Sequence, residues 1–202
     1  LEETLFVAHV GARFDDPTKP RLALIVTPTK RRTFKLLYGE AYRAPNAYET
    51  YYLWGEEYKA NPALRPEDAR TMEVAWEEYV GRHYRVGANL FAYRVENLIT
   101  QIVDPADGML VYANVGSATA RGVELEAEGR WGAGLHVRAS YAWQRGRDAE
   151  TSLRLTNSPE HVAQALASVP LGRRAFAGVS LRAISARTAK DGSRVAGYAV
   201  PA

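Results

Sequence analysis

The feature that most constrains the fold is an alternation in residues 121–131, RGVELEAEGRW. From Val123 onward, apolar or small side chains occupy every second position, and the positions between them include Glu124, Glu126 and Glu128. A period of two residues is that of a β-strand with one dry face and one wet face. Three carboxylates in a row cannot be buried without partners in a small core. They fit a wall that faces water, such as the lumen of a large membrane barrel.

Segments with strand character recur along the chain, separated alternately by tight turns and by longer polar loops. Several exceed the usual strand length of about five or six residues. Short turns at one end and long loops at the other are typical of an outer-membrane barrel, so we predict an all-β fold, an antiparallel transmembrane β-barrel with roughly ten strands in this chain. The expected strands span residues 5–14, 21–27, 33–43, 71–80, 84–103, 110–114, 121–131, 135–147, 160–169 and 175–187, with a last segment from residue 198.

Composition narrows the class of protein further. The 202 residues contain no apolar run of about eighteen, so no transmembrane helix is expected. The net charge of +3 does not argue for nucleic acid, and the absence of Cys excludes disulfides, zinc–thiolate sites and cysteine nucleophiles. Twelve Tyr and four Trp favour rings that sit at a membrane–water boundary. Trp131, beside a short turn, and Trp143, near a long loop, would supply two such girdles.

Motifs for catalysis are not visible in this sequence. The four His have no metal-ligand spacing, and there is neither a GxSxG elbow nor a phosphate-binding Gly loop. The turn sequence DPADG at residues 104–108 offers Asp104 and Asp107 but lacks the remaining oxygen ligands of a calcium loop. We therefore expect no catalytic residues, no resident metal and no cofactor.

Four stretches of the chain carry recognisable motifs in a fixed order. They are residues 36–49 (LLYGEAYRAPNAYE), 61–77 (NPALRPEDARTMEVAWE), 89–99 (NLFAYRVENLI) and 112–126 (YANVGSATARGVELE). Each match is weak alone, and together they are specific: the four stretches resemble the TonB-dependent outer-membrane receptors. The resemblance implies a barrel of about 22 strands plugged by a separate N-terminal domain. It also implies an outer-membrane location of the Gram-negative type.

The function implied by the resemblance is uptake of a scarce nutrient, such as an iron–siderophore chelate or cobalamin. Energy would come from the TonB protein, which grips a box near the receptor's N-terminus, and the remaining partner would be outer-membrane lipid. Residues 1–202 are expected to be part of the C-terminal half of the barrel, cut at both ends. The plug domain, the TonB box and a final strand ending in an aromatic residue are absent from this chain.

The resemblance also singles out motif residues, which we interpret as scaffold. Prolines fix φ and remove backbone donors where a long loop enters a strand. Asn114, Gly116 and Gly122 are expected to flank a tight reversal, since Gly allows positive φ and Asn tolerates it. The wall glutamates are expected to pair with basic residues such as Arg138, and contact with the plug is the alternative. The full set is Arg43, Pro45, Asn61, Pro62, Pro66, Glu67, Asn114, Gly116, Gly122 and Glu124.

A Tyr-rich loop is the candidate ligand site, because aromatic rings in an extracellular loop suit an aromatic or chelate ligand. The candidate residues are Tyr48, Tyr51, Tyr52, Trp54 and Tyr58, with Tyr42 nearby. Loop packing or an upper aromatic girdle explains these rings equally well. Arg43 and Lys59 are candidate attractors for an anionic chelate, although Glu49, Glu56 and Glu57 offset their charge.

Two alternatives to a transport receptor stay open at the level of sequence. An outer-membrane barrel enzyme or an autotransporter-type translocator would need a catalytic set or a passenger domain outside these residues. A soluble β-rich binding module would need shorter strands and would melt as a monomer without detergent.

Overall fold

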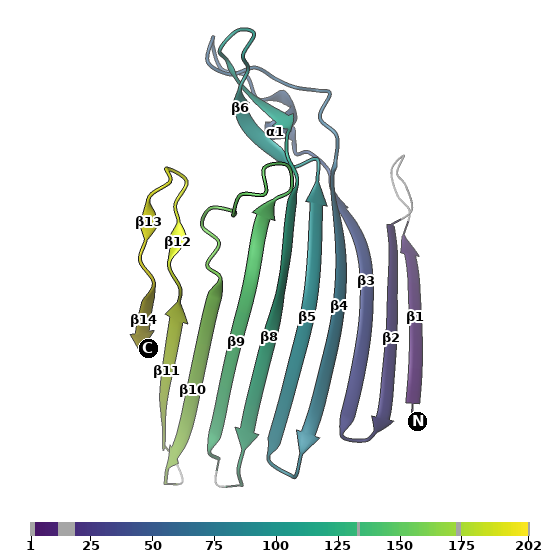
Figure 1. Cartoon of the computed structure of the whole chain (residues 1–202), viewed down its shortest axis with the longest axis vertical. Helices are drawn as coiled ribbons and strands as arrows, with labels where there is room; N and C mark the ends of the chain where they lie inside the picture. Colours follow the sequence, from purple (N-terminus) through teal and green to yellow (C-terminus); the bar gives the residue numbers. More distant parts are fainter. Residues whose placement is uncertain (1–2, 12–18, 133, 173–174, 202) are drawn as a thin grey trace.

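Ten strands form one antiparallel sheet in the computed structural model, which describes residues 3–11, 19–132, 134–172 and 175–201 (Figure 1). The spatial order is β1-β2-β3-β4-β5-β8-β9-β10-β11-β14, so each strand lies beside its neighbour along the chain except where small hairpins intervene. The strands are β1 (Glu3–Gly11), β2 (Lys19–Thr29), β3 (Arg32–Arg43), β4 (Glu67–Val80), β5 (Tyr84–Glu96), β8 (Ala118–Arg130), β9 (His136–Asp148), β10 (His161–Leu171), β11 (Ala175–Ile184) and β14 (Tyr198–Pro201).

The two ends of the sheet differ. Of the described residues, 30–31, 81–83, 131–132, 134–135 and 172 lie in connections at the lower end of Figure 1. Residues 44–66, 97–117, 149–160 and 185–197 connect strands at the upper end. The long connections contain the helix α1 (Ala47–Tyr51) and the hairpins β6 (Ile99–Val103) with β7 (Leu110–Asn114) and β12 (Arg187–Thr188) with β13 (Arg194–Val195). Within the described residues, no helix has the length and apolar character needed to cross a membrane.

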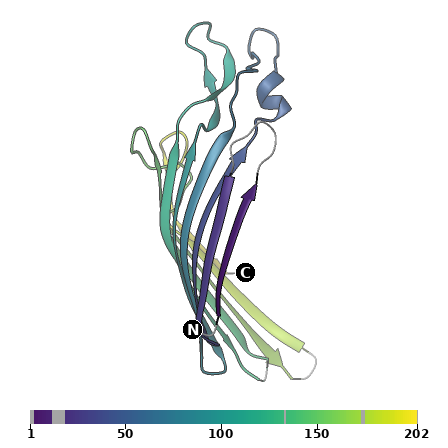
Figure 2. The ribbon, with the colours of Figure 1, turned by 90° about the vertical axis from the view of Figure 1, so that its right-hand side faces the viewer.

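The sheet is open and curved. Figure 2 shows its middle strands bent away from its two edges, so that the convex face is the one seen in Figure 1. The pleat sends alternate side chains to opposite faces. Leu125 lies in register with Ala88 and Tyr141, and these side chains belong to the convex face. Glu126 lies in register with Gly87 and Ser140 on the concave face.

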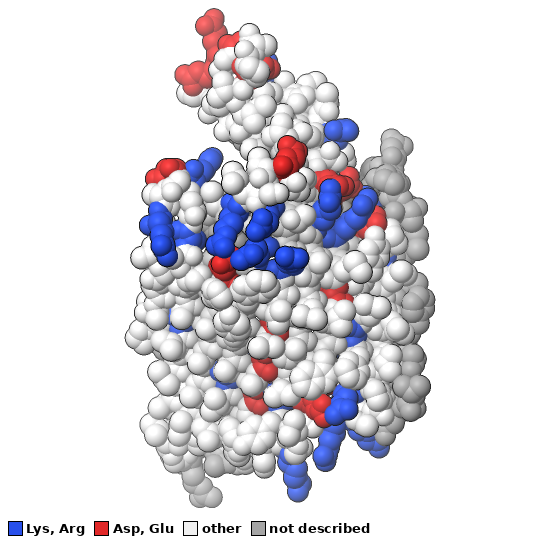
Figure 3. Space-filling model, viewed as in Figure 1, with Lys and Arg blue, Asp and Glu red and all other residues white. Residues whose placement is uncertain are grey.

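The convex face is apolar and uncovered. Its large side chains include Leu36, Val74, Leu90 and Leu125, which are 48%, 47%, 53% and 47% exposed. Figure 3 shows mostly uncharged side chains across the middle of this face, with a few charged atoms visible between them. An apolar surface of this size is stable only against another apolar medium or partner.

Little of the described chain is buried in the ordinary sense, because the sheet has no second layer. Phe91 and Val111 are the only buried hydrophobic side chains among the residues described. Phe91 stacks on Tyr93 with ring centroids 4.8 Å apart and fills the space beside Gly122. A Cβ at Gly122 would lie 2.6 Å from the Phe91 ring and 2.3 Å from the carbonyl oxygen of Trp143.

The all-β antiparallel architecture is confirmed, and three details are corrected. Gly122 lies inside β8 and provides space for Phe91, so its expected place in a tight reversal is wrong; Gly116, with φ 87°, is in the reversal. The expected single strand 84–103 breaks after β5 at Asn97, whose φ is 56°. The expected strand 175–187 ends at Ile184. The expected end of the first strand at Phe14 lies outside the described residues.

Candidate functional site

Two long connections, residues 44–66 and 97–117, project together beyond the sheet in Figure 1, and we call them the loop pair. The first begins with α1, which Asn46 caps. The Asn46 side-chain oxygen accepts a hydrogen bond from the Glu49 N–H (2.9 Å), and the Glu49 carboxylate accepts one from the Asn46 N–H (2.9 Å). This reciprocal capping box satisfies helix donors that would otherwise lack partners, so a five-residue helix forms at a defined place.

Backbone hydrogen bonds join the two members of the loop pair. The Lys59 N–H donates to the Leu110 carbonyl (3.0 Å), and the Leu110 N–H donates to the Glu57 carbonyl (2.8 Å). The Asn61 side-chain amide donates to the Tyr112 carbonyl (2.8 Å). Residues far apart in sequence are therefore held as one unit.

Asn114 holds the base of the loop pair. Its amide nitrogen donates to the carbonyls of Arg65 and Asn97, both at 2.8 Å, and its oxygen accepts from the Arg65 N–H at 2.7 Å. Asn114 ends β7 and is not among the described residues with positive φ, so the conformational reason expected for it is wrong. Through these bonds its side chain joins the backbone of residue 65 to that of residue 97 and so connects the two members of the loop pair.

Two cations that the sequence offers as attractors for a ligand are each held by two carboxylates. Lys59 Nζ lies 2.5 Å from Asp104 Oδ2 and 2.7 Å from Asp107 Oδ2. Hydrogen bonds from Lys59 lower the pKa of both carboxyl groups, and the two carboxylates raise the pKa of Lys59. The DPADG turn thus binds a side-chain ammonium, and no group of three His, Asp or Glu suited to a metal ion occurs among the described residues.

Arg43 is the second of these cations and lies where β3 meets the loop pair. Its guanidinium contacts Glu67 (2.7 Å) and Glu49 (2.9 Å), and the Glu67 carboxylate also accepts the Ile99 N–H (2.8 Å). Arg43 is therefore neutralised within the chain, in part by Glu49, one of the carboxylates expected to offset its charge. The motif prolines adjoin these contacts: Pro45 precedes Asn46, Pro62 follows Asn61, and Pro66 precedes Glu67, the first residue of β4.

Four of the five candidate ligand residues gather into one aromatic cluster. Tyr48 stacks on Tyr52 with centroids 4.3 Å apart, Tyr52 meets Tyr58 edge-on at 5.2 Å, and Trp54 lies 6.3 Å from Tyr58. Sequence reasoning missed the fifth ring, Tyr112 of β7, which lies 6.0 Å from Tyr48. We call Tyr48, Tyr52, Trp54, Tyr58 and Tyr112 the aromatic cluster.

The aromatic cluster remains accessible to a ligand. The exposed fractions of Tyr48 and Trp54 are 53% and 62%. Tyr51 is 66% exposed and makes no ring contact within the described residues, so it stands apart from the cluster. The register places Tyr42 on the convex face near the end of β3, also outside the cluster. A signal that would have found Tyr112 is that it is the first residue of the matched stretch 112–126.

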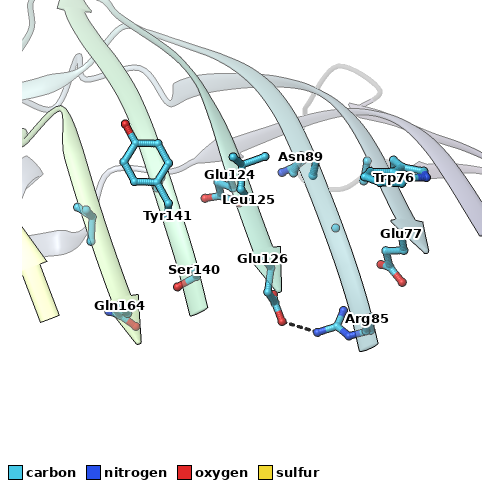
Figure 4. Close-up of a pocket in the computed structure, with 15 residues that line it drawn as sticks. Trp76, Glu77, Arg85, Asn89, Glu124, Leu125, Glu126, Ser140, Tyr141 and Gln164 are labelled. Carbon is cyan, nitrogen blue, oxygen red and sulfur yellow. Dashed lines mark hydrogen bonds and ion pairs between the residues drawn. The ribbon is translucent and has the colours of Figure 1, made fainter. Parts of the chain in front are cut away.

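The concave wall carries the glutamates of the alternation, and Figure 4 shows Glu124, Glu126 and Arg85 on neighbouring strands. Arg85 of β5 forms ion pairs with Glu126 and, at 3.2 Å, with Glu128. Arg138 of β9 lies 3.1 Å from Glu126, which confirms the predicted cross-strand pairing. The network continues to His136, whose Nε2 lies 3.0 Å from Glu128. Arg85 was not predicted, because the partner strand of 121–131 was unknown.

The fold and these two faces define a class of protein. A curved antiparallel sheet with an apolar convex face, a charged concave face, short turns at one end and long loops at the other is the wall of a transmembrane β-barrel. The family model described as "TonB dependent receptor-like, beta-barrel" matches residues 6–200. The chain therefore belongs to the TonB-dependent receptor β-barrel family and is a protein of the Gram-negative outer membrane.

Solved structures share the fold at low sequence identity. The FrpB iron transporter from Neisseria meningitidis has a TM-score of 0.70 and 15% identity, over 92% of this chain and 31% of that one. The ferric enterobactin receptor PfeA from Pseudomonas aeruginosa, a variant in complex with enterobactin, has a TM-score of 0.75 and 17% identity, over 92% and 32%. The copper transporter OprC gives 0.71 and 18%, over 91% and 30%. The chain thus spans about a third of each.

Proposed function

We propose that residues 1–202 form part of the barrel of a TonB-coupled importer of a scarce nutrient, with an iron–siderophore chelate as the substrate. The plug and the segment that contacts the TonB protein would belong to other parts of a longer protein. Support comes from the family and from the neighbours, whose names refer to iron, ferric enterobactin and copper. Neither a barrel enzyme nor an autotransporter draws similar support, and the outer-membrane family excludes a soluble module.

The observation that carries the proposal is the exposed aromatic cluster on the loop pair. Long loops of such barrels face the outside of the cell. A ligand that arrives from outside therefore reaches the aromatic cluster before it reaches the lumen. Arg43 and Lys59 are neutralised by carboxylates, so these two cations leave the exposed rings of the aromatic cluster as the main contacts for a ligand. Such a surface favours a chelate with flat or aromatic faces, because offset and edge-on ring contacts are favourable.

The motif residues serve this site indirectly in the proposal. Asn61, Asn114, Arg43 and Glu67 fix the loop pair to the sheet, which keeps the aromatic cluster in one arrangement before a ligand arrives. A preorganised site loses less conformational freedom on binding. The wall glutamates are assigned to the lumen, where Glu124 is exposed and can face a plug domain.

Binding to the full-length receptor tests the proposal. The probes are ferric enterobactin, a cupric chelate and cobalamin, followed by quenching of tryptophan fluorescence. We expect an iron chelate to bind, and Trp54→Ala and Tyr48→Ala each to weaken its binding about tenfold, the effect of losing a good ring contact. Leu153→Ala is the matched control, since Leu153 is 68% exposed in a different loop.

Two results would contradict the proposal at different levels. Unchanged affinity in both variants would remove the aromatic cluster from the ligand site. Binding of cobalamin alone, together with expression that does not respond to iron, would replace the substrate class and leave the cluster to be tested with that ligand.

A further inference from the structure

A row of arginines crosses the convex face near its long-loop end, and Figure 3 shows it as a blue patch above the mostly uncharged middle of that face. Arg121 lies in register with Ala92 of β5 and with Arg145 of β9. One step further up, Arg94 lies in register with Arg70 and Thr119. We call Arg70, Arg94, Arg121, Arg145, Arg147 and Arg154 the arginine band.

The pleat shows that the five strand residues of the arginine band, all but Arg154, share the lipid-facing side with the apolar side chains of the convex face, which we call the apolar belt. Arg121 is two residues from Val123 and four from Leu125, and alternate residues of a strand point to one face. Arg145 is likewise two residues from Trp143, with its guanidinium carbon 6.0 Å from the centre of the Trp143 ring. The band therefore faces away from the lumen and is separate from any substrate path inside the barrel.

The position of the arginine band along the strands matches the expected boundary between the apolar interior of the membrane and its polar surface. On β4, Met72, Val74 and Trp76 separate Arg70 from Glu78, the next charged residue on the same face. The eight-residue step spans about 26 Å along the strand at ~3.3 Å per residue. At a strand tilt of ~40° this is about 20 Å along the membrane normal, most of the ~25 Å apolar band of an outer-membrane barrel. Glu78 is paired with Arg32 at 2.8 Å, so the charge that ends the apolar belt on β4 is balanced within the chain.

At the upper edge of the apolar belt, the arginine side chains outnumber the carboxylates that contact them. Carboxylates near the band are Glu40, 3.7 Å from Arg70, Glu96, 2.8 Å from Arg94, and Glu160, which contacts both Arg145 (3.0 Å) and Arg154 (3.1 Å). Arg121 forms no ion pair with any described residue, and Arg147 donates only to the Ser152 carbonyl (3.2 Å) in that part of the chain. Six guanidinium groups thus face three carboxylates.

The band also encloses a groove of about 440 Å³. Arg70, Arg94, Arg121, Arg145 and Arg147 line it, and Tyr38, Met72 and Ala92 provide apolar lining. Guanidinium groups bind phosphate with paired hydrogen bonds, and arginine is favoured for such contacts. Unpaired cations at the membrane surface also gain from anionic headgroups.

We infer that the arginine band is a binding site for the phosphorylated glycolipid headgroup of the outer leaflet. Phosphates would pair with Arg121, Arg147 and their neighbours, and the acyl chains would continue down the apolar belt below. The site would anchor the barrel at a fixed depth in the asymmetric membrane. It goes beyond nutrient uptake and does not depend on which ligand the loop pair binds.

Native mass spectrometry and thermal melting of the full-length receptor in detergent test the inference. The probes are bisphosphorylated lipid A, lipid A with its phosphates removed, and inorganic phosphate. We expect bisphosphorylated lipid A to bind and to raise Tm, and Arg121→Gln with Arg147→Gln to weaken it at least tenfold. The double change Arg121→Lys with Arg147→Lys should bind with intermediate affinity, because charge remains while the paired hydrogen bonds are lost.

The control removes two exposed cations at the opposite end, Lys30→Gln with Arg82→Gln, and should bind lipid A like the unchanged receptor. Ligand binding at the loop pair serves as the check that the variants fold. The inference is overturned if the phosphate-free lipid binds equally well, or if the arginine variants keep full affinity. It is also overturned if inorganic phosphate at low millimolar concentration gives the same stabilisation, since the site would then hold only an ion.

Discussion

The wall network around Glu126 and Glu128 on the concave face and the arginine band on the convex face differ in how fully their arginines are paired. On the concave face, Arg85 and Arg138 each contact wall glutamates from neighbouring strands. On the convex face, Arg121 and Arg147 form no ion pair with any described residue, although they lie on the same two strands as the wall network. Charges satisfied within the chain stabilise the wall, whereas charges left over are available to another molecule.

Substitutions on the two faces should therefore affect two different properties, the stability of the barrel and its binding of lipid. Substitutions on the concave face should change the stability of the barrel, because partners in the chain are left without their counterpart. Substitutions of Arg121 and Arg147, the members of the arginine band without an ion pair among the described residues, should leave stability alone and change lipid binding. The loop pair follows the concave pattern, since Lys59 and Arg43 are each satisfied by two carboxylates.

The largest effect is expected at Gly122, where the concave face is tightest. A Cβ there would lie 2.3 Å from the backbone carbonyl of Trp143, which cannot move without disturbing the β8–β9 pairing. Gly122→Ala should lower the free energy of unfolding by about 3 kcal/mol, the upper end of overpacking costs. Urea unfolding of the full receptor in detergent measures this. Gly87→Ala, with its nearest contact at 3.3 Å, is the control and should cost less than about 1 kcal/mol. Equal losses of stability in the two variants would show that the close contacts around Gly122 cost no more than those around Gly87.

Arg85→Ala should have the next largest effect. It removes the shared cation between Glu126 and Glu128, and the side chain of Glu128 is only 10% exposed. The wall is partly solvated, so we expect a loss of about 1–2 kcal/mol, measured by the same unfolding experiment. Arg82→Ala, in the exposed β4–β5 turn, should change it by less than about 0.5 kcal/mol. A loss at Arg85 no greater than at Arg82 would mean that the wall network contributes nothing.

The loop pair should loosen in acid. The pKa values of Asp104 and Asp107 are lowered by hydrogen bonds from Lys59. A lowered carboxyl pKa stabilises the folded contact above the ordinary value of 3.8, and that stability is lost as the pH falls through the lowered values. Because the chain has no Cys, spin labels at introduced cysteines, Ala63→Cys and Ala106→Cys, can report the distance between the two loops.

In that experiment the distance distribution should be narrow at neutral pH and broaden below pH 3.8. The variant Lys59→Met should be broad already at neutral pH, because it lacks the cation that joins the loops. A distribution that stays narrow in the variant would assign the rigidity to Asn61 and Asn114 instead.

Alternation predicted both faces of β8 from Val123 downward, because period two follows directly from the pleat. The same rule, extended upward, would have placed Arg121 on the apolar face. A charge at an apolar position breaks the pattern, so the alternation read from Val123 does not by itself assign Arg121 to a face. Arg121 is a member of the arginine band. It shows that a break in a pattern can mark a binding surface rather than an end.

Other features could not be predicted from local pattern. Arg85 meets Glu126 only because β5 lies beside β8, with β6 and β7 excluded from the main sheet. Lys59 and its carboxylates are more than forty residues apart. The candidate aromatic residues were correctly placed in one long loop, but Tyr112 joins them from a second loop. Pairing between distant segments is a property of the fold, and sequence periodicity carries no information on it.

The smallest effect on stability is expected for Arg121→Gln. This substitution tests directly whether an unpaired arginine of the convex face contributes to folding. Arg121 is exposed and has no ion-pair partner among the described residues, so its loss leaves no group in the chain unsatisfied. The free energy of unfolding in lipid-free detergent should change by less than about 0.5 kcal/mol. In membranes that contain bisphosphorylated lipid A, the same substitution should lower Tm relative to the unchanged receptor. A loss of stability in lipid-free detergent comparable to that of Arg85→Ala would show that the convex arginines, too, are held by the chain itself.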